Sequence, residues 1–280
     1  MTTMQTAHEA PTAFLIRPGG RLAVDVRGDG PLVVCVPGMG DLRSVYRFLC
    51  PVLLDAGYRV AAMDLRGHGD SDATFDAYDD VAAGSDVLAL IAALGEPAVV
   101  VGNSMGAGAA AWAAAEAPER VAGLVLIGPF VRQVPVGRVM ELAFRLALRW
   151  PWGRAAWLAY YPRLYPGRPP ADLEAHRKRI RRSLSQPGHW RAFARTIRTS
   201  HAPVEARLGE VHAPTLVVMG SRDPDFPDPA AEAQLVARRL HGEVLLVPEA
   251  GHYPQAEYPE VVGPAVLRFL GTVFRPHPSS

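Results

Sequence analysis

Short apolar runs alternate with longer helical patterns along this chain, and this alternation restricts its fold more than any other feature. Strand-like runs occur at 21–26, 32–36, 58–63, 98–102, 121–128, 215–220 and 243–248, and helical patterns near 44–56, 78–94, 105–117, 229–240 and 259–271. Several of the strand-like runs are continuously apolar, as expected of strands that are covered on both faces. The pattern predicts an α/β fold in which helices cover both faces of a mostly parallel sheet.

The alternation is interrupted in two places. The runs before Pro37 have no helix between them, so we expect an antiparallel edge there. From 130 to 207 no clear strand occurs, while tryptophan, tyrosine and arginine are frequent, which indicates a helical insertion between two strands. We therefore expect a core domain made of 1–129 and 208–280, with an insertion at 130–207.

Composition excludes several functional classes. The 280 residues are 49% hydrophobic and 20% charged, and the net charge of +1 gives no electrostatic reason to expect a nucleic acid or membrane partner. The first residues lack the pattern of a signal peptide, and no apolar run approaches the roughly 20 residues of a membrane span. We expect a soluble cytoplasmic protein. Cys35 and Cys50 lie in apolar surroundings and suggest neither a disulfide nor a metal site.

The pentapeptide GNSMG at 102–106 stands between an apolar run and an alanine-rich helical pattern. A Gly-x-Ser-x-Gly pattern also arises by chance, and glycine is common wherever the backbone turns sharply. The functional alternative is a nucleophilic serine on a strained strand-to-helix turn, where small residues two before and two after it allow close packing. This alternative requires a base, an acid and donors for an oxyanion elsewhere in the chain.

A base and an acid occur in the order that such a serine requires. Serine is a weak nucleophile at neutral pH and needs a histidine that is oriented by a carboxylate. Asp223 lies just past the strand-like run at 215–220, and His252 lies just past the next one. Loops at the carboxyl ends of neighbouring parallel strands converge, so the two side chains can meet beside Ser104. Asp225 is an alternative acid.

Two backbone N–H groups are candidate oxyanion donors. The N–H of Met105 lies at the start of the helix that follows Ser104, where the helix dipole favours negative charge. The loop CVPGMGD at 35–41 offers a second donor, the N–H of Met39, although an ordinary glycine-rich turn would have a similar sequence. A phosphate-binding loop is disfavoured, because no Gly-Lys-Ser/Thr follows.

Together, GYRVAAMDLRGHGDSD at 57–72, GNSMG, MGSRD and EAGHYPQAEYPE resemble the α/β-hydrolase superfamily, in its capped esterase and epoxide-hydrolase-like branch. The match covers about 20–129 and 208–272, and the insertion at 130–207 occupies the position of the family's helical cap. The resemblance implies the α/β-hydrolase fold, with Ser104 as nucleophile, His252 as base, Asp223 as orienting acid and Met39 and Met105 as oxyanion donors. The chain departs from the family pattern in having Pro37-Gly38 where His-Gly is usual.

Family members that open epoxides or remove halogens attack with aspartate, so the serine at position 104 implies acyl transfer to Ser104 and then to water. We expect neither a cofactor nor a metal. We expect an ester, lactone or thioester of a hydrophobic small molecule as the substrate. A C–C bond hydrolase, a perhydrolase and an acyltransferase would use the same triad, and a non-catalytic receptor on this fold is an alternative of another class. Candidate substrate-binding residues are Phe130 and aromatic residues of the insertion, which could equally pack the cap: Trp150, Trp152, Trp157, Tyr160, Tyr161 and Tyr165.

Overall fold

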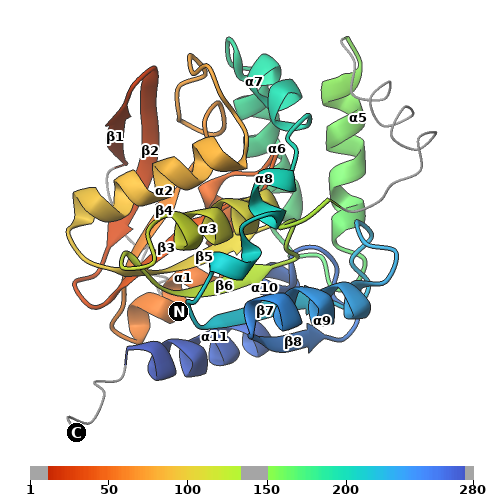
Figure 1. Cartoon of the computed structure of the whole chain (residues 1–280). Coiled ribbons are helices and arrows are strands. Elements are labelled where there is room, and N and C mark those ends of the chain that lie inside the picture. Colours follow the sequence, from red (N-terminus) through yellow and green to blue (C-terminus); the bar gives the residue numbers. More distant parts are fainter. Residues whose placement is uncertain (1–11, 134–150, 275–280) are drawn as a thin grey trace, which may run out of the picture.

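The computed structural model describes residues 12–133 and 151–274, and its centre is one eight-stranded sheet (Figure 1). The strand order is β1-β2-β4-β3-β5-β6-β7-β8. β1 pairs antiparallel with β2, β2 pairs antiparallel with β4, and all other pairs are parallel. The strands are β1 (Ala13–Arg17), β2 (Gly20–Arg27), β3 (Leu32–Val36), β4 (Arg59–Met63), β5 (Ala98–Asn103), β6 (Val121–Ile127), β7 (Thr215–Gly220) and β8 (Glu243–Val247).

Helices cover both faces of the sheet, as the apolar runs predict. Alternate residues of β3 point to opposite faces: Val34 and Val36 join the apolar core beneath α2, α3 and α9, and Val33 and Cys35 join the core on the side of α1 and α11. The helices of the core are η1 (Arg43–Tyr46), α1 (Leu49–Asp55), α2 (Asp80–Leu94), α3 (Met105–Glu116), α9 (Pro229–Leu240), α10 (Pro254–Glu257) and α11 (Pro259–Val273).

All seven strand-like runs are strands, but the expected antiparallel edge is only partly correct. β2 lies in that edge, whereas β3 is parallel to both of its neighbours. After β3 the chain crosses over through η1 and α1, and it then adds β4 between β2 and β3, parallel to β3. β1 has no counterpart among the expected runs. It is short and largely exposed, so it lacks a core-facing apolar pattern.

The single helix expected over 44–56 is two pieces, η1 and α1. Pro51 lies in the first turn of α1 and has no N–H to donate to the carbonyl of Arg47, so a continuous helix through this point is disfavoured. The helix expected over 78–94 begins at Asp80. The side chain of Asp79 caps it by accepting from Ala82 N at 2.9 Å, and Gly95 ends it at a φ of 83°.

In the segment between β6 and β7, all the regular elements that the structure describes are helical, and Figure 1 shows α6 and α7 in the upper part of the view, with α5 to their right. Its elements are α5 (Gly153–Tyr160), η2 (Tyr161–Leu164), α6 (Leu173–Leu184), α7 (His189–Thr196), α8 (Ala202–Glu205) and η3 (Leu208–Glu210). We call it the inserted segment. Trp150 lies outside the described residues, as does most of the start of the chain, where no signal peptide is expected. The division into core and cap at 130–207 stays a prediction.

Within the described ranges, every helix is too short or too polar to cross a lipid bilayer.

Candidate active site

Ser104 occupies a sharp turn between β5 and α3. Its φ of 56° and ψ of −122° lie in a region that few residues other than glycine adopt. The backbone N–H of Ser104 donates to the carbonyl of Ile127 at 2.8 Å, and its own carbonyl accepts from Phe130 N at 3.3 Å. These bonds to the end of β6 and to the following loop hold the turn, so the strain is sustained by the surrounding structure.

The two glycines of the pentapeptide are required by close backbone contacts. A Cβ atom on Gly102 would lie 2.3 Å from the carbonyl oxygen of Gly106. A Cβ atom on Gly106 would lie 2.3 Å from the carbonyl oxygen of Val36 and 2.6 Å from that of Pro37. The spacing of the motif thus reflects how tightly α3 packs against β5 and the end of β3.

Asp223 and His252 form a buried hydrogen-bonded pair at the carboxyl ends of β7 and β8. His252 Nδ1 lies 2.7 Å from Asp223 Oδ2, and each residue is 2% exposed. The carbonyl of His252 accepts from Asn103 Nδ2 at 3.2 Å, which joins it to the residue next to Ser104. The structure therefore brings the predicted nucleophile, base and acid to one edge of the sheet. Since Nδ1–H donates to the carboxylate, Nε2 is the ring atom that can accept a proton.

Asp225 also lies near the imidazole, but its Oδ2 is 3.7 Å from Nδ1, and its side chain is 23% exposed where that of Asp223 is fully buried. The distances favour Asp223 as the orienting acid.

Both carboxylates affect the pKa of His252. Burial alone would lower this pKa, but the charges of Asp223 and Asp225 outweigh the effect of burial and raise it to about 9.

One ligand atom from each of Asp223, Asp225 and His252 lies within 4.8 Å of the others, which is close enough for one metal ion to reach all three. The sequence predicts no metal. The contact that the structure shows within this cluster is the hydrogen bond between His252 Nδ1 and Asp223, and the expected absence of a metal stays a prediction.

The loop that carries Met39 lies directly against Ser104. A Cβ atom on Gly38 would be 2.8 Å from Ser104 Cβ, so only glycine permits this approach.

His68 is bonded to the same loop. The N–H of Gly40 donates to Nε2 of His68 at 3.0 Å, and Nδ1 of His68 lies 2.9 Å from the carbonyl of Arg66. Burial lowers the pKa of His68 to about 4, so its ring stays neutral and can accept this bond. His68 thus positions the loop that carries Met39.

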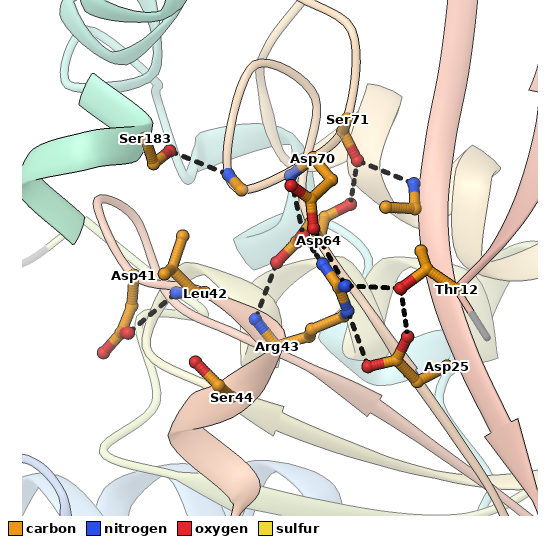
Figure 2. Close-up of polar contacts among 12 residues, drawn as sticks. Thr12, Asp25, Asp41, Leu42, Arg43, Ser44, Asp64, Asp70, Ser71 and Ser183 are labelled. Atoms are coloured by element: carbon orange, nitrogen blue, oxygen red, sulfur yellow. Dashed lines mark hydrogen bonds and ion pairs between the residues drawn. The ribbon is translucent and has the colours of Figure 1, made fainter. Parts of the chain in front are cut away.

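Arg43, just after this loop, is the centre of a second network, drawn in Figure 2. Its guanidinium pairs with Asp25 at 2.8 Å, with Asp70 at 2.9 Å and with the buried Asp64, and its backbone N–H donates to Asp64 Oδ1 at 2.7 Å. Burial raises the pKa of Asp64 to about 6, although the charge of Arg43 opposes this shift. The network fixes the loop to β2 and to the turn that follows β4.

The predicted substrate-binding residues lie in different surroundings. The Phe130 ring centroid is 6.1 Å from that of His252 and 4.8 Å from that of Phe226, so Phe130 borders the pair of Asp223 and His252. Trp157 is buried, and its Nε1 donates to the carbonyl of Gly40 at 3.3 Å. Tyr161 is fully buried and Trp152 is 56% exposed. Their contact with a substrate stays a prediction.

Sequence reasoning missed a buried polar group that joins the inserted segment to the core. Asp41 is fully buried, accepts from Tyr161 Oη at 2.6 Å, and lies 2.7 Å from Nε2 of His176 on α6. The only signal for it in the sequence is an acidic residue at the end of an otherwise apolar and glycine-rich loop, which gives no indication of a partner 135 residues away.

The comparisons with known proteins agree with this architecture. The model of the alpha/beta hydrolase family matches residues 33–265. RutD of Variovorax paradoxus (strain S110), a proposed carbamate hydrolase, is 30% identical over 258 residues, which cover 89% of this chain and 94% of RutD. The 2-hydroxy-6-oxo-6-phenylhexa-2,4-dienoate hydrolase of Burkholderia cepacia is 30% identical over 267 residues, 89% and 91% of the two chains.

A solved thermophilic esterase from Thermogutta terrifontis is 26% identical and superimposes with a TM-score of 0.74 over 95% of this chain and all of its own. The family match covers most of the chain, including the candidate nucleophile, acid and base. The chain therefore has the α/β-hydrolase fold and belongs to the alpha/beta hydrolase family.

Proposed function

We propose that this protein is a serine hydrolase that cleaves an ester, lactone or thioester of a hydrophobic small molecule through an acyl-enzyme. The observation that carries the proposal is the position of Ser104 on a strained turn, at the same edge of the sheet as the buried pair of His252 and Asp223. Strained backbone conformations of this kind cluster at active sites.

The proposed reaction has two stages. Nε2 of His252 accepts the proton of Ser104 as Oγ attacks the substrate carbonyl, and Asp223 stabilises the imidazolium that forms. The imidazolium then returns the proton to the leaving group as the bond to the carbonyl carbon breaks. In the second stage water attacks the acyl group, its proton passes to His252, and the acid leaves as Ser104 regains its proton.

The N–H groups of Met39 and Met105 are the proposed oxyanion donors. Met105 is the first residue of α3, where backbone N–H groups have no acceptor within the helix. The loop of Met39 is held against Ser104 by His68 and Arg43, so its N–H is fixed before the reaction begins. Donors that are positioned in advance stabilise the oxyanion without reorganisation during the reaction.

A hydrophobic substrate is supported by the aromatic rings of Phe130 and Phe226 beside His252. The test is a panel of p-nitrophenyl esters, aryl lactones and acyl thioesters of increasing chain length, measured with wild type and Ser104→Ala. Hydrolysis by wild type that rises with acyl length and is absent in the variant supports the proposal. No hydrolysis of any member by the folded wild type would contradict it.

A second candidate, hydrolysis of a C–C bond beside a carbonyl, is favoured by the similarity to the Burkholderia cepacia hydrolase. The same triad could serve this reaction. A vinylogous diketone of the kind that this relative's name describes separates the two, because its cleavage at a rate above that of every ester would favour the second candidate.

A further inference from the structure

A second carboxylate lies beside the proposed catalytic histidine, and the proposed reaction does not use it. Asp225 Oδ2 is 3.7 Å from His252 Nδ1, and the backbone N–H of Asp225 donates to Oδ1 of Asp223 at 3.0 Å. This bond occupies the oxygen of Asp223 that does not face the imidazole. The two carboxylates are thus held at different distances from the same Nδ1–H.

The other oxygen of Asp225 is bonded to the inserted segment. Oη of Tyr160, the last residue of α5, donates to Asp225 Oδ1 at 2.5 Å. The Tyr160 ring also packs beside that of Trp157, at 6.0 Å between centroids, and Trp157 in turn donates to the carbonyl of Gly40. α5 therefore contacts both sides of the candidate site, the oxyanion loop and the second carboxylate.

The charges around His252 are almost all negative. Asp223 and Asp225 face its ring from the loop after β7, and Asp41, before η1, adds a weaker negative field. The aromatic rings of Tyr253 and Phe130 lie beside the imidazole on its other sides. Arg163 in η2 is the cation whose field reaches Tyr160. An imidazolium formed at His252 would lie between two carboxylates.

We propose that Asp225 is a positioning residue that stabilises the protonated ring of His252, and that Tyr160 couples it to the position of α5. This inference rests on the proposed function, since it concerns the same histidine. Burial raises the pKa of Asp225, while the charge of His252 and the hydrogen bond from Tyr160 oppose this shift, because a hydrogen bond to a carboxylate favours its charged form. Loss of the bond from Tyr160 would make Asp225 easier to protonate and would weaken its support for the imidazolium.

The test is the titration of His252 in wild type and Asp225→Asn, followed by NMR of the imidazole protons. The chain has nine histidines, so the resonance is assigned by its absence from the spectrum of His252→Gln. Asparagine keeps the size of the side chain but removes its charge. We expect the pKa of His252 to fall by about one unit in Asp225→Asn, as is typical for loss of an opposite charge at this distance. The acidic limb of kcat/KM should move to lower pH by the same amount.

Glu243→Gln is the matched control, because it also removes one negative charge but lies exposed at the start of β8. It should leave the titration of His252 unchanged. Tyr160→Phe should lower the pKa of His252 by less than Asp225→Asn, and should cause no further change when the two substitutions are combined. This non-additivity separates coupling through Asp225 from a general disturbance of α5.

The inference is overturned if His252 titrates alike in wild type and Asp225→Asn, or if Tyr160→Phe shifts the titration equally with and without Asp225. Should Asp225→Asn not fold, Tyr160→Phe alone decides, and an unchanged titration overturns the inference. The NMR titration requires no turnover. A wild type that hydrolyses nothing would therefore contradict the proposed function without deciding this inference. An unchanged titration of His252 would overturn this inference without contradicting the proposed function.

Discussion

Ser104 combines a conformation that suits glycine with a side chain that glycine lacks. Such strain typically costs about 1–3 kcal/mol. Glycine would relieve this strain, but its greater freedom in the unfolded state cancels part of the gain in stability. We expect Ser104→Gly to unfold with a free energy about 1 kcal/mol higher than that of Ser104→Ala, with both variants inactive. Urea denaturation at pH 7 measures this difference. Equal stability of the two variants would mean that the turn is not strained.

His252 is expected to control the pH dependence of catalysis. Its pKa is raised to about 9 by the two carboxylates, while the proposed reaction needs the neutral ring. In the free enzyme, kcat/KM should therefore increase about tenfold per pH unit at pH 6–8 and level off near pH 9. The same shift stabilises the fold fully below the unfolded pKa of about 6.5, and this contribution is lost as pH rises through 9. A profile that is already flat at pH 7 would contradict this expectation.

At the scale of elements, the loop that carries Met39 depends on a buried charge pair. Asp64 is fully buried and has Arg43 as its cationic partner. Removal of one member of such a pair leaves the other uncompensated and typically costs about 3–5 kcal/mol. We expect a loss of this size in Arg43→Met.

The matched variant is Arg43→Met combined with Asp64→Asn, which removes the uncompensated charge as well. It should recover a large part of the lost stability, as measured by chemical denaturation. If the double variant is less stable than Arg43→Met, the contact between Arg43 and Asp64 is not what stabilises the loop.

At the scale of the whole molecule, the inserted segment is joined to the core through Asp41. Burial favours the neutral form of this carboxyl, but His176 and the hydroxyl of Tyr161 outweigh it and lower its pKa. Its contribution to stability is therefore present above the unfolded pKa of about 3.8 and is lost as pH falls through the lower folded value. We expect Asp41→Asn to increase amide exchange in α6 far more than in α3, as followed by hydrogen–deuterium exchange. Equal protection of α6 in both proteins would show that other contacts hold the segment.

Structural features that depend on a short stretch of sequence were predictable, and contacts that connect distant segments were not. The alternation of strands and helices, the pentapeptide around Ser104 and the order of Ser104, Asp223 and His252 are each readable over short stretches. The bond between Gly40 and His68, the pair of Asp41 and His176 and the bond between Tyr160 and Asp225 join residues 28, 135 and 65 positions apart. Nothing in the local pattern of either partner specifies the other, because each pairing depends on how segments that are distant in the sequence pack together.

The central claim, that Ser104 is an activated nucleophile, is tested most directly by labelling with a fluorophosphonate. Wild type and Ser104→Ala are incubated with the probe under identical conditions, and the intact mass of each is measured. The account predicts one probe per wild-type molecule, attached at Ser104, and none on the variant. A folded wild type that remains unlabelled, or a variant that is labelled equally, would contradict it.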